Sequence, residues 1–286
     1  MAGMPVTDAD LTTLVDSYDI LDLGMRADEE RRRRHGTRTT FVRVADVSAD
    51  LAAEVAVPPA AREIRIVGVP GSRQAAVERI EMVVTAAAGA PVTGFSLADL
   101  EQLAAREQIT LRALLEEMRA AGLELVAEAP IDRLQNPRRS IEQVNIAGLA
   151  LARLTVHRLE RASLPTFFRE VIALQEWVAV IRAFAPLPRT INPSVPTTGF
   201  DDVKRIALAR LFVTNIPSIQ VDWSLYGPKL AQVALTVGAD DVDGVSAVDD
   251  LSEGRRRAPH EEIVRNIRAA GLDPVERDGR FELHPR

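Results

Sequence analysis

The sequence predicts an α/β protein whose parallel strands and covering helices form a barrel. From about residue 39, short β-like runs alternate with longer helical ones, and strands joined through helices run parallel to each other. About seven such strand–helix units fit into the 286 residues. A parallel sheet needs cover on both faces or closure on itself, and this number of units favours a barrel, complete or shortened, over an open doubly wound sheet.

The expected strands are rich in Val, Ile, Thr and Phe, which suit a pleated and largely buried surface. The first three are TTFVRV, EIRIVGV and PVTGF, at residues 39–44, 63–69 and 91–95. Four more strands are expected at residues 123–126, 167–172, 180–185 and 218–223.

The helices between these strands have recognisable start and stop signals. Ser72 is expected to cap one helix, and Thr110 caps the next, which Gly122 ends. Thr198 begins a capping-box-like sequence before a further helix. The run LARLTVHRLERA, which contains His157, also reads as helical, so this histidine is expected on a helix surface.

The N-terminal residues differ from the rest because they read as purely helical. They end in the charge run ADEERRRRHG, where glutamates neutralise part of the arginine charge. A solvated helix face is therefore favoured over an anion-binding patch. We expect two parts: a helical segment over 1–38 and a barrel over 39–286 that includes a C-terminal helix–strand extension.

Composition excludes several classes of function. The formal net charge of −6 gives no electrostatic reason to expect nucleic acid or a membrane surface as a partner. No run approaches the roughly 20 apolar residues of a membrane span, and no signal pattern is recognisable, so we expect a cytoplasmic protein. The chain has no cysteine and four histidines, which argues against disulfides, thiolate metal sites and cysteine nucleophiles.

The C-terminal third has a specific resemblance. The run TGFDDVKRIALARLFVTNIPSIQVDWSLYGPKLAQVALTVGADDVDG, followed by EEIVRNIRAAGLDPVERDGRF, resembles the end of the aminofutalosine synthases. These are radical SAM enzymes of the futalosine route to menaquinone. Weaker similarity extends upstream through DILDLGMRADEERRRRHG, EIRIVGV and VTGFSLADLEQLA. The resemblance implies a barrel of the radical SAM type, preceded by a helix.

One departure from this family concerns its cofactor. The family places Cys-x-x-x-Cys-x-x-Cys after the first strand, where three thiolates hold a four-iron cluster that binds S-adenosylmethionine. Here the first strand leads into ADVSADLAAEVAVPPAA, which has no cysteine. We therefore expect no 4Fe-4S cluster and no other cofactor. A residual S-adenosylmethionine site would involve Gly68, since relatives carry a glycine pair after the second strand.

Polar residues near strand ends are the candidates for a retained pocket. Alternation in SIQVDWS separates Gln220 and Asp222 from their apolar neighbours and places them on the lumen side, with Ser224 just beyond. Barrel enzymes keep their chemistry at the C-terminal ends of strands. Glu128 matches a glutamate that closes a strand in the family. The alternative interpretation is a hydrogen-bonded polar cluster that closes the barrel.

The stretch GADDVDG contains Asp240, Asp241 and Asp243. A calcium loop with Gly244 at its sixth position would lack an acid at position one, which disfavours calcium. Two interpretations stay open. Either the stretch is a structural turn in which Asp240 accepts hydrogen bonds, or it is the rim of a substrate site close to Asp243, as the resemblance implies. We predict no catalytic residue and no metal ligand.

Together these observations favour a cluster-less paralogue of aminofutalosine synthase, acting as a non-catalytic partner or regulatory subunit in menaquinone biosynthesis. The alternative is an enzyme that uses the barrel pocket, without radical chemistry, on a related aromatic acid or nucleoside. The expected partner is a second copy of the chain or a cysteine-containing radical SAM homologue, and neither nucleic acid nor a membrane. Radical SAM activity is not expected because no cysteine is present.

Overall fold

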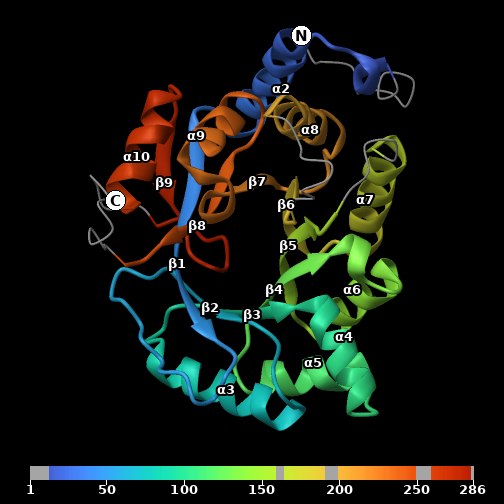
Figure 1. Ribbon diagram of the computed structural model, residues 1–286, viewed down its shortest axis with the longest axis vertical. Coiled ribbons are helices and arrows are strands. Elements are labelled where there is room, and N and C mark those ends of the chain that lie inside the picture. Colours follow the sequence, from blue (N-terminus) through green and yellow to red (C-terminus); the bar gives the residue numbers. More distant parts are fainter. Residues whose placement is uncertain (1–12, 159–163, 191–198, 249–258, 285–286) are drawn as a thin grey trace.

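The computed structural model describes residues 13–158, 164–190, 199–248 and 259–284. Eight parallel strands close into a barrel in chain order, since each strand pairs with the next and the eighth pairs with the first (Figure 1). The strands are β1 (Arg38–Ser48), β2 (Glu63–Val67), β3 (Val92–Ser96), β4 (Leu125–Pro130), β5 (Ala150–Val156), β6 (Ile181–Pro188), β7 (Ser218–Asp222) and β8 (Asp241–Ser246). The predicted parallel barrel is confirmed, with eight strands.

Helices surround this barrel, and one more helix precedes it. They are α2 (Ile20–His35), α3 (Arg73–Ala86), α4 (Leu97–Arg106), α5 (Leu111–Ala120), α6 (Pro137–Ile146), α7 (Leu164–Val178), α8 (Gly199–Phe212), α9 (Trp223–Thr236) and α10 (Pro259–Ala269). Helix α2, the expected N-terminal helix, packs mainly against α8.

The predicted caps are present, because Ser72 accepts a hydrogen bond from the Ala75 amide and Thr110 from that of Ala113. Thr198 lies outside the described residues. No described helix is both long and apolar enough to cross a membrane.

Two element predictions are wrong. The strand expected at 167–172 lies inside α7, and the helix expected around LARLTV is β5, which His157 directly follows. Every β5 residue after Ala150 is buried, so the strand shows no alternation and cannot be told from a buried helix by its pattern. In α7, Phe167, Val171 and Leu174 recur at helical spacing, and this amphipathic period overrides the β propensity of the segment.

The connection from β1 to β2 is the exception to the strand–helix alternation. Residues 49–62 are all described and contain no helix, whereas each later connection between barrel strands contains at least one. Arg79 of α3 is fully buried and binds the backbone at the start of this connection. It donates hydrogen bonds to the carbonyl oxygens of Ser48 (2.7 Å) and Ala53 (3.0 Å).

The C-terminal segment closes the end of the barrel where the strands begin. Strand β9 (Asp273–Glu276) pairs with the first part of β1, whereas β2 pairs with its last part. The chain then turns beneath the strands, where the Gly279 amide donates to the carbonyl of Arg62 and the Arg277 side chain is buried. Strand β9 and the following turn therefore cover the part of the lumen that β2 leaves open.

Candidate functional site

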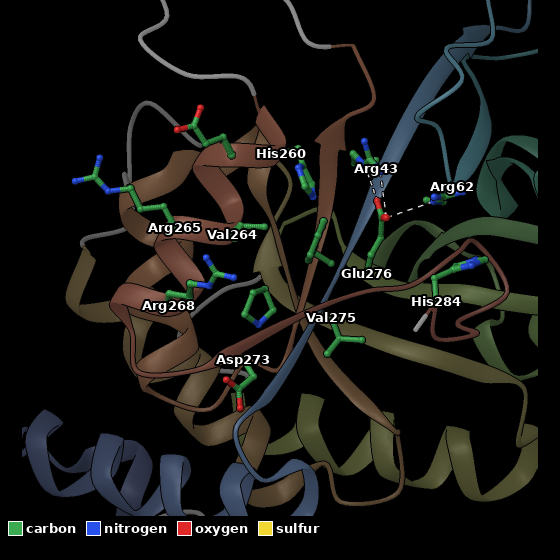
Figure 2. Close-up of a pocket in the computed structure, with 13 residues that line it drawn as sticks. Arg43, Arg62, His260, Val264, Arg265, Arg268, Asp273, Val275, Glu276 and His284 are labelled. Carbon is green, nitrogen blue, oxygen red and sulfur yellow. Dashed lines mark hydrogen bonds and ion pairs between the residues drawn. The ribbon is translucent and has the colours of Figure 1, made fainter. Parts of the chain in front are cut away.

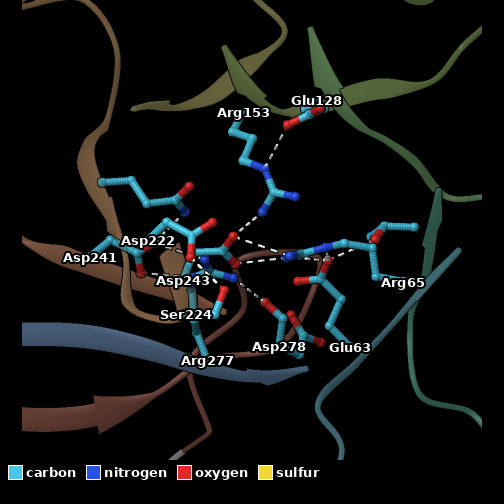
Figure 3. Close-up of polar contacts among 12 residues, drawn as sticks. Glu63, Arg65, Glu128, Arg153, Asp222, Ser224, Asp241, Asp243, Arg277 and Asp278 are labelled. Atoms are coloured by element: carbon cyan, nitrogen blue, oxygen red, sulfur yellow. Dashed lines mark hydrogen bonds and ion pairs between the residues drawn. The ribbon is translucent and has the colours of Figure 1, made fainter. Parts of the chain in front are cut away.

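The lower part of the lumen, at the start of the strands, is filled by a buried ion pair. Arg277 donates to both carboxylate oxygens of Asp241, at 2.7 and 2.8 Å (Figure 3). Gln220 of β7 donates to the same carboxylate at 2.7 Å. All three side chains are almost entirely buried. Gln220 is thus on the lumen side, as predicted, but its amide is held by Asp241 well below the mouth of the barrel.

The centre of the lumen is filled by Asp243, which lies between arginines from two other strands. Arg65 of β2 donates to Asp243 at 2.7 Å, and Arg153 of β5 donates to its other oxygen (Figure 3). Arg65 also pairs with Glu63. Burial alone would raise the pKa of Asp243, but the charges of Arg153 and Arg65 outweigh it and hold that pKa well below its usual range. The carboxylate is therefore ionised, paired and poorly suited to accept a proton near neutral pH.

Above this network, at the C-terminal ends of the strands, lies a cavity of about 260 Å³. Charged side chains from several strands reach it. Arg189, which follows β6, forms ion pairs with Glu128 of β4 at 3.2 Å and with Asp222 of β7 at 3.1 Å. Pockets for drug-sized ligands typically span about 300–1,000 Å³, so this cavity suits only a small ligand. The other residues that line it include Asp46, Arg65, Gly68, Ser96, Asp99, Arg153, Ser224 and Gly244.

The last two strands of the barrel determine where Asp222 and Ser224 lie. Asp222 ends β7 and caps α9, because its Oδ1 accepts hydrogen bonds from the Leu225 amide at 3.0 Å and from the Ser224 hydroxyl at 2.8 Å. Gly244 of β8 faces this pair with a φ of 71°. A Cβ at Gly244 would lie 2.9 Å from Asp222 Oδ1. Glycine is therefore needed here both for its conformation and for the close approach of the carboxylate.

Three polar atoms beside the cavity have no hydrogen-bond partner in the described part of the chain. They are Ser96 Oγ, Glu128 Oε2 and Arg153 Nε. The last two face each other at 3.9 Å, too far for a hydrogen bond. Because an unsatisfied buried polar group costs about 1–3 kcal/mol, the cavity favours a small molecule with both donor and acceptor groups, water included.

The structure thus brings several of the predicted pocket residues together. Glu128, Asp222, Ser224 and Gly68 line one cavity, and Asp243 lies directly beneath it, bonded to two arginines that also line it. Whether any of them binds a ligand stays a prediction.

Asp240 lies apart from this group. Its Oδ1 accepts hydrogen bonds from the Ile219 amide at 2.8 Å and from Arg210 of α8, and His35 at the end of α2 lies 3.5 Å from its Oδ2. These partners belong to the strand edge and the helix layer. The contacts are those of a hydrogen-bonded turn, and they tie α2 and α8 to the start of β8.

The arginines of the site, Arg65, Arg153 and Arg189, were not predicted from the sequence. A usable signal exists for two of them. Arg65 in EIRIV and Arg153 in ALARLTV are the single cations of buried, mostly apolar strands. A charge at such a position is expected to face a polar lumen with a partner. Their shared partner, Asp243, is distant in sequence.

The residues after β1 do not fit an iron–sulfur cluster held by thiolates. Residues 49–62 read ADLAAEVAVPPAAR, so they supply two exposed carboxylates and no sulfur or imidazole ligand. Among the described residues there is also no group of three His, Cys, Asp or Glu side chains able to hold a metal ion.

Comparison with known proteins finds similarity over part of the chain. Residues 177–286 match the CofH/MqnC C-terminal region. The chain is 27% identical over 229 residues to the aminodeoxyfutalosine synthase of Thermus thermophilus, covering 68% of this chain and 60% of that protein. It is 38% identical over 112 residues to the 5-amino-6-(D-ribitylamino)uracil–L-tyrosine 4-hydroxyphenyl transferase of Methanopyrus kandleri, covering 37% of this chain and 30% of that protein. The chain spans less than two thirds of the length of these relatives.

The fold is also similar to that of a solved structure. Methylornithine synthase superposes with a TM-score of 0.69 at 14% identity, covering 95% of each chain. At this identity the likeness concerns the fold alone.

Proposed function

We propose that this chain is an aminofutalosine synthase-like paralogue with a radical SAM-type barrel but without radical SAM chemistry. It acts as a non-catalytic partner or regulatory subunit in menaquinone biosynthesis by the futalosine route. The observation that supports this most strongly is the complete absence of cysteine from a sequence that resembles this family. No other set of side chains after β1 replaces the three thiolates.

The contents of the lumen support the same proposal. Asp243, Arg65 and Arg153 fill the centre of the barrel, and the remaining cavity of about 260 Å³ is small for a nucleoside cofactor together with a substrate. The carboxylates nearest the cavity are already engaged. Asp222 caps α9 and pairs with Arg189, and Glu128 pairs with Arg189 as well. A general base needs a pKa near the working pH, which the lowered pKa of Asp243 does not provide.

A second candidate function is an enzyme or ligand-binding protein that uses this cavity for a small aromatic acid. Ser96 Oγ and Arg153 Nε favour it, since neither has a hydrogen-bond partner among the described residues and both lie next to the cavity, where the hydroxyl can donate or accept and Nε can donate. A carboxylate would satisfy Arg153 Nε and the Ser96 hydroxyl. This candidate needs no cluster and retains the barrel pocket.

Isothermal titration calorimetry separates the two functions. We expect no binding of S-adenosylmethionine or of futalosine-type nucleosides, because the cavity is too small for them. Heat from a 3-substituted benzoate that disappears in the Ser96→Ala variant would favour the second function. Ser96 is only partly buried and caps nothing with its hydroxyl, so this variant should keep its fold. Saturable binding of S-adenosylmethionine would contradict the first proposal.

A further inference from the structure

Arg189 spans the mouth of the barrel between two strands that are not neighbours. It directly follows β6, and its guanidinium forms ion pairs with Glu128 of β4 at 3.2 Å and with Asp222 of β7 at 3.1 Å. Strands β5 and β6 lie between β4 and β7 in the sheet. All three side chains line the cavity at the mouth. The two ion pairs therefore cross this cavity instead of joining adjacent strands.

The ion pairs of a larger groove outside the barrel are arranged differently. This groove of about 1020 Å³ lies between α10, β1 and β9 (Figure 2). Glu276 of β9 pairs there with Arg43 of β1 at 2.5 Å and with Arg62 at 3.3 Å. Strand β9 pairs directly with β1, and the Arg62 amide donates to the Arg43 carbonyl, so these ion pairs join adjacent segments of one wall. They leave the groove open, whereas those of Arg189 cross the mouth of the barrel.

The backbone that carries Arg189 is fixed on two sides. The Arg189 amide donates to the carbonyl of Val156, at the end of β5, at 2.8 Å. On the other side, the Tyr226 hydroxyl of α9 donates to the carbonyl of Pro188, the residue before Arg189. The ring of Pro188 also restricts its own φ. The Arg189 side chain thus starts from a defined position, which lowers the entropy cost of holding its guanidinium between the two carboxylates.

Glu128 and Asp222 depend on Arg189 for the compensation of their charges. Asp222 Oδ2 accepts from Arg189 at 3.1 Å, whereas its Oδ1 accepts from two uncharged groups. Glu128 also faces Arg153, but the Nε of that arginine lies 3.9 Å away, too far for a hydrogen bond. Burial alone would lower the pKa of Arg189, but the charges of Glu128 and Asp222 outweigh it and raise that pKa. The two carboxylates thus form a site for a planar cation whose N–H groups point in several directions, as those of a guanidinium do.

We propose that Glu128 and Asp222 form a guanidinium-binding site that the chain's own Arg189 occupies, so that Arg189 acts as an internal ligand and closes the mouth of the barrel. In the intact chain, an external guanidinium compound has to compete with a side chain that is tethered beside its site. Removal of the Arg189 side chain leaves two uncompensated carboxylates, which a free guanidinium compound then binds. This inference goes beyond the proposed function and does not rest on it, because it requires these ion pairs and nothing about radical chemistry.

Chemical rescue of the Arg189→Ala variant with methylguanidinium tests this proposal. Differential scanning fluorimetry at constant ionic strength measures the melting temperature, with sodium chloride in place of methylguanidinium chloride as the reference. We expect the variant to melt below the wild type and to regain melting temperature as methylguanidinium is added, because the ligand binds the folded state. The wild type should show no such gain, since its site is occupied. Isothermal titration calorimetry should show binding to the variant at least about tenfold tighter than to the wild type.

Arg133→Ala is the matched control. Among the described residues Arg133 pairs with Asp99 alone, at 3.5 Å, so methylguanidinium should not rescue this variant. The double variant Arg189→Ala/Asp222→Asn keeps an oxygen to cap α9 but loses one carboxylate of the site, and it should bind methylguanidinium at least about tenfold more weakly than Arg189→Ala. Equal rescue of either control variant would overturn the proposal, because the gain would then be unspecific. So would an Arg189→Ala variant that binds no methylguanidinium, whatever its melting temperature, or one that stays unfolded at every concentration of it.

Discussion

Replacing Asp243 by alanine is expected to lower the free energy of unfolding by about 3–5 kcal/mol. The substitution removes the carboxylate that Arg65 and Arg153 share in the centre of the lumen. Arg153 has no alternative partner at hydrogen-bond distance, since Glu128 lies 3.9 Å away. Arg65 would then keep only Glu63, and buried Arg153 would lose its ion pair at hydrogen-bond distance. Urea denaturation near pH 7 measures the loss.

The pH dependence of stability provides an independent test of the same group. The pKa of Asp243 in the folded state is held well below that of an unfolded aspartate, about 3.9. A lowered folded pKa means that the stabilisation is complete above the unfolded value and is lost as the pH falls below it. The wild type should therefore lose stability below about pH 4 more steeply than the Asp243→Asn variant.

Asp46 is the matched control for this prediction. It lies on β1, also lines the cavity, and its side chain forms no hydrogen bond or ion pair with another described residue. Burial raises its pKa, so its charged form is not favoured by folding. Asp46→Ala should cost less than about 1 kcal/mol. A similar, small loss for Asp243→Ala would show that the central network does not stabilise the barrel.

Replacing Asp240 by alanine is expected to cost about 3–5 kcal/mol as well, for a separate reason. Arg210 of α8 is completely buried, and without Asp240 only the Gly238 carbonyl, at 2.7 Å, would remain as its partner. The Ile219 amide would also lose its acceptor. Thermal and urea denaturation report the loss, while ligand binding in the mouth cavity should be unchanged because Asp240 does not line it.

The double variant Arg210→Met/Asp240→Ala distinguishes a lost ion pair from general damage to the turn. Replacing both members of a buried pair by apolar groups is often close to neutral. The double variant should therefore be more stable than Asp240→Ala alone. If it is less stable by the sum of two large losses, the two residues act independently and the pair does not explain the role of Asp240.

The sequence allowed the barrel and part of its pocket to be predicted, for identifiable reasons. Alternation in SIQVDWS correctly placed Gln220 and Asp222 in the lumen, because polar and apolar residues alternate along β7. The same rule could not show which of Asp240 and Asp243 faces the lumen. That depends on where the strand begins, and in the structure β8 begins at Asp241. Strand β5 was missed because burial on both faces removes the alternation on which the prediction relies.

Long-range contacts explain what the sequence could not provide. The ion pairs of Asp243 join β8 to β2 and β5, and Arg277 reaches Asp241 from the C-terminal turn. No local pattern specifies such partners. The absence of a helix between β1 and β2 could be predicted in part from the sequence. The two adjacent prolines, Pro58 and Pro59, disfavour a helix across the end of that connection.

Anaerobic reconstitution with iron and sulfide tests most directly whether this barrel has lost radical SAM chemistry. After desalting, we expect this protein to show no four-iron absorbance or electron paramagnetic resonance signal, and to form no 5′-deoxyadenosine from S-adenosylmethionine under reducing conditions. A bound four-iron signal together with 5′-deoxyadenosine formation would contradict the proposed function.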